Sequence, residues 1–127
     1  MNSNQTEAWL KSGHRKGENH MGKVYGAVLE DWELPELFYK LENHIDDRGL
    51  IIDFWRPEKF KFGCLRPCMY LHHFTIIGDT LHLTSTQRSL DTAVGENFNS
   101  LSLYVMLRVF AKITGLKVGR ITRNIIN

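Results

Sequence analysis

The sequence predicts a fold of the α+β class, built from an antiparallel or mixed sheet and a central buried helix. Three patterns lead to this prediction. Residues 31–45 place apolar side chains at helical spacing, and residues 70–89 form two strand-like runs about a Gly-Asp turn. Residues 99–114 are apolar on almost every side. Because a helix that is apolar all round is normally buried, this segment is expected at the centre of the fold.

The length and composition fit one domain. The chain has 127 residues, of which 43% are hydrophobic and 24% are charged, as in an ordinary soluble domain. We therefore expect a single domain over residues 1–127. It consists of a polar, loop-rich lead-in over residues 1–30 and a structured part over residues 31–127. In the lead-in, only residues 7–11 are expected to form a helical turn.

Charge, hydropathy and cysteine content exclude several classes of protein. The net charge of +2 is too small to indicate a nucleic-acid partner. No apolar run approaches the roughly 18 residues that span a bilayer, and residues 1–6 lack a signal-peptide core. A cytoplasmic protein with no membrane partner is expected. The two cysteines, Cys64 and Cys68, have no second pair, so neither a metal site nor a disulfide framework is predicted.

The first regular elements are a helix and a strand. The helix of residues 31–45 carries Pro35 in its first turn, where proline is tolerated. Its apolar positions predict one buried face, made of Leu34, Leu37, Phe38, Leu41 and Ile45. Residues 46–49 break the helix as a turn, and residues 50–55 follow as a strand.

Residues 70–77 and 81–89 predict an antiparallel hairpin about Gly78-Asp79. Positions whose numbers add up to about 157 then face each other, which places Cys68 opposite Ser89. Neighbouring side chains on a strand point to opposite faces, so His72 and His73 are expected to have packing or surface roles. After the apolar helix of residues 99–114, Gly115 supplies the C-terminal cap and residues 116–127 predict a strand.

A thiol, an anion clamp and an amide occur within one short span of the chain. Cys68 is a nucleophile as the thiolate, which a cation such as Arg88 stabilises. The guanidinium of Arg88 can take two oxygens of a phosphate, and the hydroxyl of Ser89 can donate to the same anion. The amide of Asn99 both donates and accepts, so it can pair with a ring that shows an oxygen beside an N–H, as uracil does.

The order and spacing of these residues resemble thymidylate synthase, which methylates dUMP at carbon 5 with methylenetetrahydrofolate. The resemblance extends outward through residues 21–26 and 45–49 and covers almost the whole chain. The chain looks like the middle half of such an enzyme, with the first and last segments missing. The matching residues are Pro67-Cys68, Gln87-Arg88-Ser89, Asp91, Gly95 and Phe98-Asn99.

The resemblance implies a partial thymidylate synthase-like fold, a homodimer or a heterodimer with an intact relative, and a site for dUMP and 5,10-methylenetetrahydrofolate. Cys68 would be the catalytic nucleophile and Asp91 would contact the folate. Tyr25 would lie near the nucleotide, or be a packing tyrosine. Arg48 would reach the partner's phosphate, or be a surface arginine paired with a neighbouring aspartate. The remaining residues implied in substrate binding are Gln87, Arg88, Ser89 and Asn99.

Three departures from the family pattern qualify what this chain does. Met69 replaces a histidine after the nucleophile, Gly49 replaces a second arginine, and Glu96-Asn97 replaces an apolar residue and a proline. The segments expected to be missing carry further catalytic groups, and they would also cover the apolar helix. The alternatives to a thymidylate synthase are a non-catalytic half-enzyme that pairs with or inhibits an intact one, and an inactive gene fragment.

Overall fold

The computed structural model describes residues 3–90 and 95–126, with backbone only for residues 3–6. Two of the helical segments are short 3-10 helices, η1 and η2, and the others are α-helices. In chain order the elements are α1 (Ser3–Leu10), η1 (Tyr25–Val28), α2 (Glu33–Glu42), β1 (Ile51–Asp53), η2 (Pro57–Phe62), β2 (Met69–Ile77), β3 (Thr80–Gln87), α3 (Gly95–Thr114) and β4 (Lys117–Ile125).

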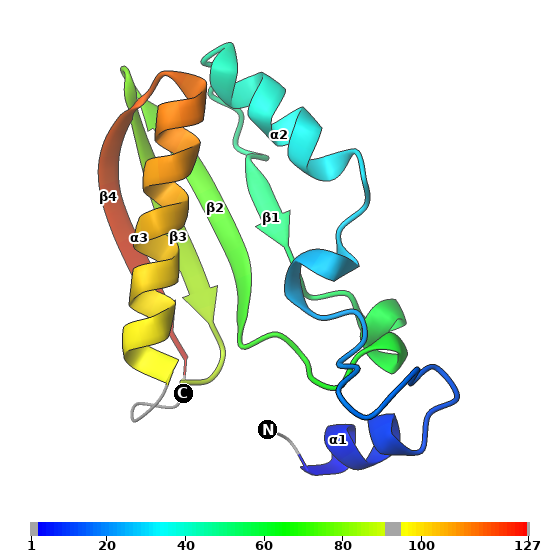
Figure 1. The fold of residues 1–127 in the computed structure, drawn as a ribbon. Helices are drawn as coiled ribbons and strands as arrows, with labels where there is room; N and C mark the ends of the chain where they lie inside the picture. Colours follow the sequence, from blue (N-terminus) through cyan, green and yellow to red (C-terminus); the bar gives the residue numbers. More distant parts are fainter. Residues whose placement is uncertain (1–2, 91–94, 127) are drawn as a thin grey trace.

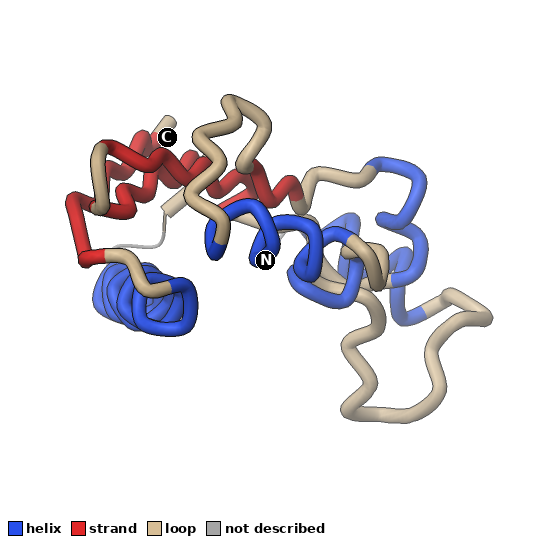
Figure 2. Tube along the Cα trace, turned by 90° about the horizontal axis from the view of Figure 1, so that it is seen from above, coloured by secondary structure: helices blue, strands red, loops and turns tan. Residues whose placement is uncertain are grey.

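The four strands form one mixed sheet in the order β1-β2-β3-β4 (Figure 1). β2 is antiparallel to both β1 and β3, whereas β4 is parallel to β3. The parallel pair requires a crossover connection, and α3 provides it by packing on β3 and β4. Seen end-on in Figure 2, α3 lies against one side of the strands. The predicted α+β class with a mixed sheet is therefore confirmed.

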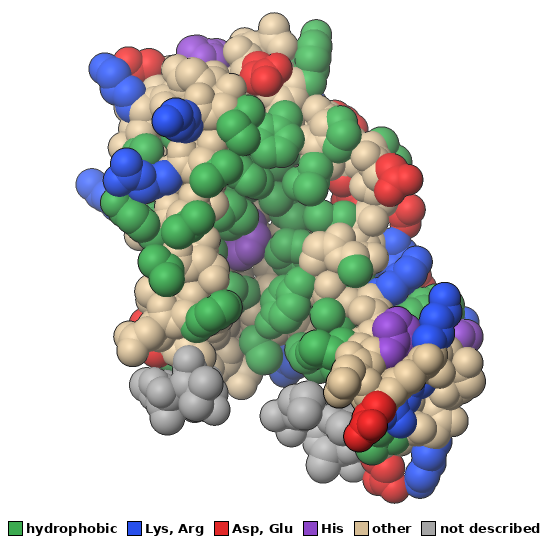
Figure 3. All heavy atoms as spheres, viewed as in Figure 1, with side chains coloured by type: hydrophobic (Ala, Val, Ile, Leu, Met, Phe, Trp, Pro, Cys, Tyr) green, Lys and Arg blue, Asp and Glu red, His purple; other side chains and the backbone are tan. Residues whose placement is uncertain are grey.

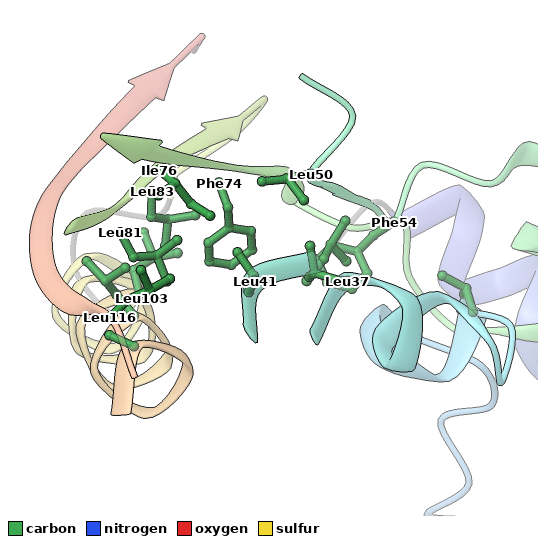
Figure 4. Close-up of a cluster of buried hydrophobic side chains, with 14 residues drawn as sticks. Leu37, Leu41, Leu50, Phe54, Phe74, Ile76, Leu81, Leu83, Leu103 and Leu116 are labelled. Carbon is green, nitrogen blue, oxygen red and sulfur yellow. The ribbon is translucent and has the colours of Figure 1, made fainter. Parts of the chain in front are cut away.

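The core lies between this side of the sheet and the helices α2 and α3 (Figure 4). Phe74 of β2 is fully buried and stacks on Phe110 of α3, with ring centroids 5.3 Å apart. Phe110 also contacts Phe38 of α2 at 4.7 Å. One chain of aromatic rings thus joins the sheet to both helices. The fully buried leucines around it are Leu41, Leu50, Leu81, Leu83, Leu103 and Leu107.

The helix α2 is shorter than the predicted segment of residues 31–45. It ends at Glu42, and His44 adopts a left-handed conformation with φ of 52°. Lys40 in the last turn pairs with Asp47 at 2.8 Å, which ties the following turn back to the helix. Ile45 therefore lies outside the helix and is 40% exposed instead of joining the predicted buried face.

The helix α3 begins at Gly95, before the predicted start at residue 99. Only one of its faces is buried, by Leu103, Leu107 and Ala111, so in this chain the helix is not enclosed on all sides. Figure 3 shows hydrophobic side chains gathered on the surface where α3 lies. The exposed patch expected for this helix is thus present, and its members are Phe98, Leu101, Tyr104, Val105, Val109 and Ile113.

The predicted hairpin register holds over most of its length. Paired positions run from Ile77 opposite Thr80 to Leu71 opposite Thr86, as expected. An irregularity between Met69 and Leu71 then shifts the pairing, so that Met69 lies opposite Gln87. Because of this one-residue bulge, the placement of Cys68 opposite Ser89 is wrong. Cys68 instead pairs with Arg88, the first residue after β3.

The lead-in is anchored more firmly than its polar sequence indicates. Its helix, α1, spans Ser3–Leu10 rather than residues 7–11. Trp9 is buried, and its indole N–H donates to the carbonyl of His20 at 3.0 Å. Gly22 pairs with Gly63 in an isolated β-bridge, so the lead-in docks on the segment after η2.

Replacing Gly22 with alanine is expected to lower the free energy of unfolding by about 2 kcal/mol, because residue 22 has φ of 77° and a left-handed conformation disfavours a Cβ. The added Cβ would also lie 2.1 Å from the carbonyl oxygen of Phe62. Urea denaturation measures the change. Gly13→Ala is the matched control, because a Cβ there meets nothing within 4 Å. Equal midpoints for both variants would contradict the proposed close approach.

Candidate functional site

The candidate site lies where β2 begins and β3 ends. Cys68 directly precedes β2 and Arg88 directly follows β3. The backbone N–H of Arg88 donates to the carbonyl of Cys68 at 2.9 Å. The bulge described above produces this pairing, which brings the predicted nucleophile and the predicted cation together as cross-strand neighbours.

The side chain of Arg88 is held against the loop that precedes Cys68. Its Nε donates to the carbonyl of Pro67 at 3.0 Å, and its Nη2 donates to that of Arg66 at 3.3 Å. The guanidinium also lies over the ring of Trp55, 5.4 Å from its centroid. The residue is nevertheless exposed, and a guanidinium has five N–H donors. Arg88 is thus fixed in place while it can still bind an anion from solvent.

Tyr25 reaches the same site from η1. The backbone N–H of Cys68 donates to the Tyr25 hydroxyl oxygen at 3.2 Å. Burial raises the pKa of Tyr25 more than the hydrogen bond from the Cys68 backbone lowers it, so the hydroxyl keeps its proton at neutral pH. The Tyr25 ring packs on Phe54 with centroids 6.0 Å apart. The ring of Tyr25 therefore packs while its hydroxyl contacts the backbone of Cys68, and its place near a nucleotide stays a prediction.

Gln87 lies beneath this pair, on the core side of the sheet. It is 1% exposed, and its side-chain amide N–H donates to the carbonyl of Ser89 at 2.7 Å. Its amide oxygen accepts a hydrogen bond from Arg123 of β4 at 3.0 Å. Gln87 therefore does not contact solvent directly, and it connects the backbone beside Arg88 to the last strand.

Arg123 is a residue that our sequence analysis missed. It pairs with Glu96 of α3 at 2.7 Å and donates to Ser100 at 2.8 Å. The hydrogen bond from Arg123 also holds the pKa of Glu96 below its usual value, so the carboxylate stays ionised and paired with a cation. The only signal in the sequence was the acidic residue itself, because its partner is 27 positions away.

Three further residues predicted for the site are Asn99, Arg48 and Asp91. Asn99 is half-buried near the start of α3, in the same part of the helix as Glu96. Arg48 is exposed in the turn before β1. The register of β1 places that turn at the opposite end from Cys68, so one chain does not bring these two together. Asp47 pairs with Lys40 instead of with Arg48, and Asp91 lies outside the described residues.

His72 is buried behind the site and is expected to make stability pH-dependent. Its ring contacts Phe54 at 5.3 Å and shares a hydrogen bond with Ser85 at 3.1 Å. Burial lowers the pKa of His72 from 6.5 to about 4. Between these values the unfolded chain binds a proton and the folded chain does not. The free energy of unfolding should therefore fall by about 3 kcal/mol as the pH decreases from about 6.5 to 4.

Urea denaturation at several pH values measures this dependence. His72→Asn should remove most of the slope above pH 4.5, whereas His73→Asn, on the opposite face of β2, should retain it. An unchanged slope in His72→Asn would show that burial of this ring is not its source.

Residues 3–90 and 95–126 contain no group of three or more His, Cys, Asp or Glu side chains placed to hold a metal ion. Both cysteines there are free thiols, with Cys64 buried and Cys68 partly exposed. Within the same ranges, no helix has the length and apolar character needed to cross a bilayer.

Comparison with known proteins identifies the family. The thymidylate synthase family model matches residues 1–127. The chain is 48% identical to thymidylate synthase from Vibrio atlanticus and 47% identical to that from Pseudoalteromonas translucida, over 99% of its length. In both cases the match covers 48% of the relative, so the chain spans about half the length of these curated proteins.

Solved structures give the same result. Thymidylate synthase A from Bacillus subtilis matches with a TM-score of 0.79 at 27% identity, over 88% of this chain and 44% of that one. The enzyme from phage T4 matches with a TM-score of 0.75 at 26% identity, over 83% and 39%. The matched structures and sequences agree over most of the chain. This protein therefore belongs to the thymidylate synthase family.

Proposed function

We propose that this chain carries part of a thymidylate synthase catalytic site, which converts dUMP to dTMP in the cytoplasm with 5,10-methylenetetrahydrofolate as co-substrate. The observation that carries the proposal is the pairing of Arg88 with Cys68 across the bulged end of the hairpin. This pairing makes an exposed arginine and a partly exposed cysteine cross-strand neighbours, a combination that suits covalent chemistry on a nucleotide monophosphate.

In the proposed reaction, the Cys68 thiolate adds to carbon 6 of dUMP, and the electron pair moves to carbon 5. Carbon 5 attacks the methylene group of the folate and becomes bonded to it. Loss of the carbon 5 proton then expels the folate nitrogen and leaves an exocyclic methylene group on the ring. Hydride transfer from the tetrahydrofolate to this methylene expels the Cys68 thiolate and gives dTMP and dihydrofolate. Covalent addition thus replaces one difficult substitution by easier steps.

The remaining residues bind and orient the substrates. Arg88 and Ser89 hold the phosphate, and Gln87 supports both from the buried side of the sheet. Asn99 recognises the oxygen and N–H of the uracil ring. Asp91 contacts the folate, and Tyr25 orients the backbone of Cys68 through its hydroxyl. In a homodimer, Arg48 would bind the phosphate held by the partner, because it lies far from Cys68 in its own chain.

A covalent complex with 5-fluoro-dUMP and methylenetetrahydrofolate tests the proposal. Fluorine cannot leave as a cation, so the reaction stops with the nucleotide bonded to sulfur. Intact-mass spectrometry should show one adduct on the chain. Cys68→Ser should abolish it, while Cys64→Ser, at a buried thiol, should retain it. No adduct on the unmodified chain at saturating ligand would rule out autonomous chemistry.

A second candidate function is a non-catalytic half-enzyme that pairs with an intact thymidylate synthase. The apolar patch on α3 favours this function, because exposed patches of this kind mark interaction surfaces. Phe98 alone is 74% exposed. Co-elution with a full-length synthase, together with loss of that enzyme's activity, would support this candidate and would be absent under the first.

A further inference from the structure

Arg123 of β4 is joined by side-chain hydrogen bonds to three residues near the end of the sheet that carries the candidate site. Its Nη1 donates to Glu96 at 2.7 Å and to Ser100 at 2.8 Å, and its Nη2 donates to Gln87 at 3.0 Å. Its Nε is buried and has no partner among the described residues. The guanidinium, in a side chain that is 15% exposed, therefore lies between α3 and β3 and not in solvent.

These contacts leave the Gln87 amide only one orientation. An amide has one acceptor end and one donor end, so an oxygen held by Arg123 turns the nitrogen toward the carbonyl of Ser89. A flipped amide would put its N–H group against a guanidinium, which has no acceptor. The backbone of Gln87 is also fixed, because its carbonyl accepts the N–H of Ile126 at 2.8 Å. The orientation of Gln87 thus depends on β4.

We propose that Arg123 is a positioning residue for the phosphate-binding pair Arg88 and Ser89. By holding the oxygen of the Gln87 amide, it directs the amide nitrogen to the Ser89 carbonyl and fixes the backbone on which both phosphate ligands are mounted. Glu96 in turn holds Arg123 by charge. This inference rests on the proposed function only in naming the anion as the phosphate of a nucleotide.

A different result is expected if the ion pair between Arg123 and Glu96 only stabilises the fold. Such a pair would change the free energy of unfolding and leave the preference for phosphorylated ligands as it was. If Arg123 positions Arg88 and Ser89, its loss also changes that preference. Displacing these two residues weakens the binding of dUMP but not of deoxyuridine, which lacks the phosphate. The ratio of the two dissociation constants therefore separates the two roles.

Calorimetric titration with dUMP and deoxyuridine measures this ratio. In Arg123→Met the dissociation constant for dUMP should rise about tenfold, as for the loss of a hydrogen bond to a charged group, with less than a twofold change for deoxyuridine. The dissociation constant of Arg123→Lys for dUMP should lie between those of Arg123→Met and the unmodified chain. Lysine keeps the positive charge but loses the planar guanidinium with its paired N–H donors. Arg120→Met, at an exposed arginine of the same strand, is the matched control. Equal weakening of both ligands would overturn the proposal.

The exchange rate of the Gln87 side-chain amide protons provides a readout that needs no ligand. NMR should show slow exchange in the unmodified chain and at least about tenfold faster exchange in Arg123→Met. Should Arg123→Met fail to fold, Glu96→Gln gives the same comparison with the hydrogen-bond acceptor retained. If the unmodified chain does not bind dUMP, the proposed function fails while the exchange rates still decide the role of Arg123. Identical exchange rates of the Gln87 amide in the unmodified chain and in Arg123→Met would overturn the positioning role of Arg123.

Discussion

Arg88→Met is expected to slow the reaction of Cys68 with 5-fluoro-dUMP about 100-fold, measured as the rate of covalent adduct formation by intact mass. Two effects combine. The guanidinium supplies charged hydrogen bonds to the phosphate, and each such bond contributes about 1.5–3 kcal/mol. It also holds the carbonyls of Pro67 and Arg66, so its loss frees the loop that carries the nucleophile.

Two further variants separate these effects. Arg88→Lys keeps the positive charge but loses the planar fork, so its rate should lie between those of Met and the unmodified chain. Arg66→Met is the control, because only its backbone carbonyl contacts Arg88, while its own guanidinium lies over Phe60 at 5.0 Å. Its rate should stay within about twofold. Similar slowing in Arg66→Met and Arg88→Met would show that Arg88 has no special role.

Phe74→Ala is expected to have the largest effect on stability, lowering the free energy of unfolding by about 3–5 kcal/mol. Phe74 is fully buried, and its ring stacks on Phe110, which in turn contacts Phe38. Its removal leaves a cavity at the point where β2, α2 and α3 meet. The free energy of unfolding of such domains is only about 5–15 kcal/mol, so Phe74→Ala would remove a large share of it.

Urea denaturation followed by circular dichroism measures this change. Ile77→Ala is the matched control, because Ile77 lies on the same strand but is 65% exposed. Its effect should stay near 0.5 kcal/mol, as for surface substitutions generally. Comparable losses in the two variants would contradict the position of the core between the sheet and the two helices.

Local patterns predicted most of the elements, while long-range contacts decided their ends. The hairpin about Gly78 was predictable because alternation and a turn signal coincide there. The bulge before Leu71 has no glycine to mark it, so the partner of Cys68 was missed by one residue. The first turn of α3 was not predicted because its residues are polar. Glu96 in that turn is held by Ser100 of the same helix and by Arg123, which lies far along the chain.

The candidate site was predictable to the extent that it depends on one hairpin. Cys68 and Arg88 are close because two neighbouring strands carry them, and strand pairing can be read from sequence. Tyr25 and Arg123 join the site from distant segments, through contacts that no local pattern specifies. Asn99 was predicted from the chemistry of its amide and from the family resemblance, and its recognition of uracil stays a prediction.

Peptide mapping of the adduct formed with 5-fluoro-dUMP and methylenetetrahydrofolate tests the central claim most directly. The account predicts that the nucleotide is found on the peptide containing Cys68, at one equivalent per chain, and that Arg88→Met greatly reduces it. An adduct on Cys64, or equal labelling of the two cysteines, would contradict the claim that Arg88 and the hairpin end select Cys68 as the nucleophile.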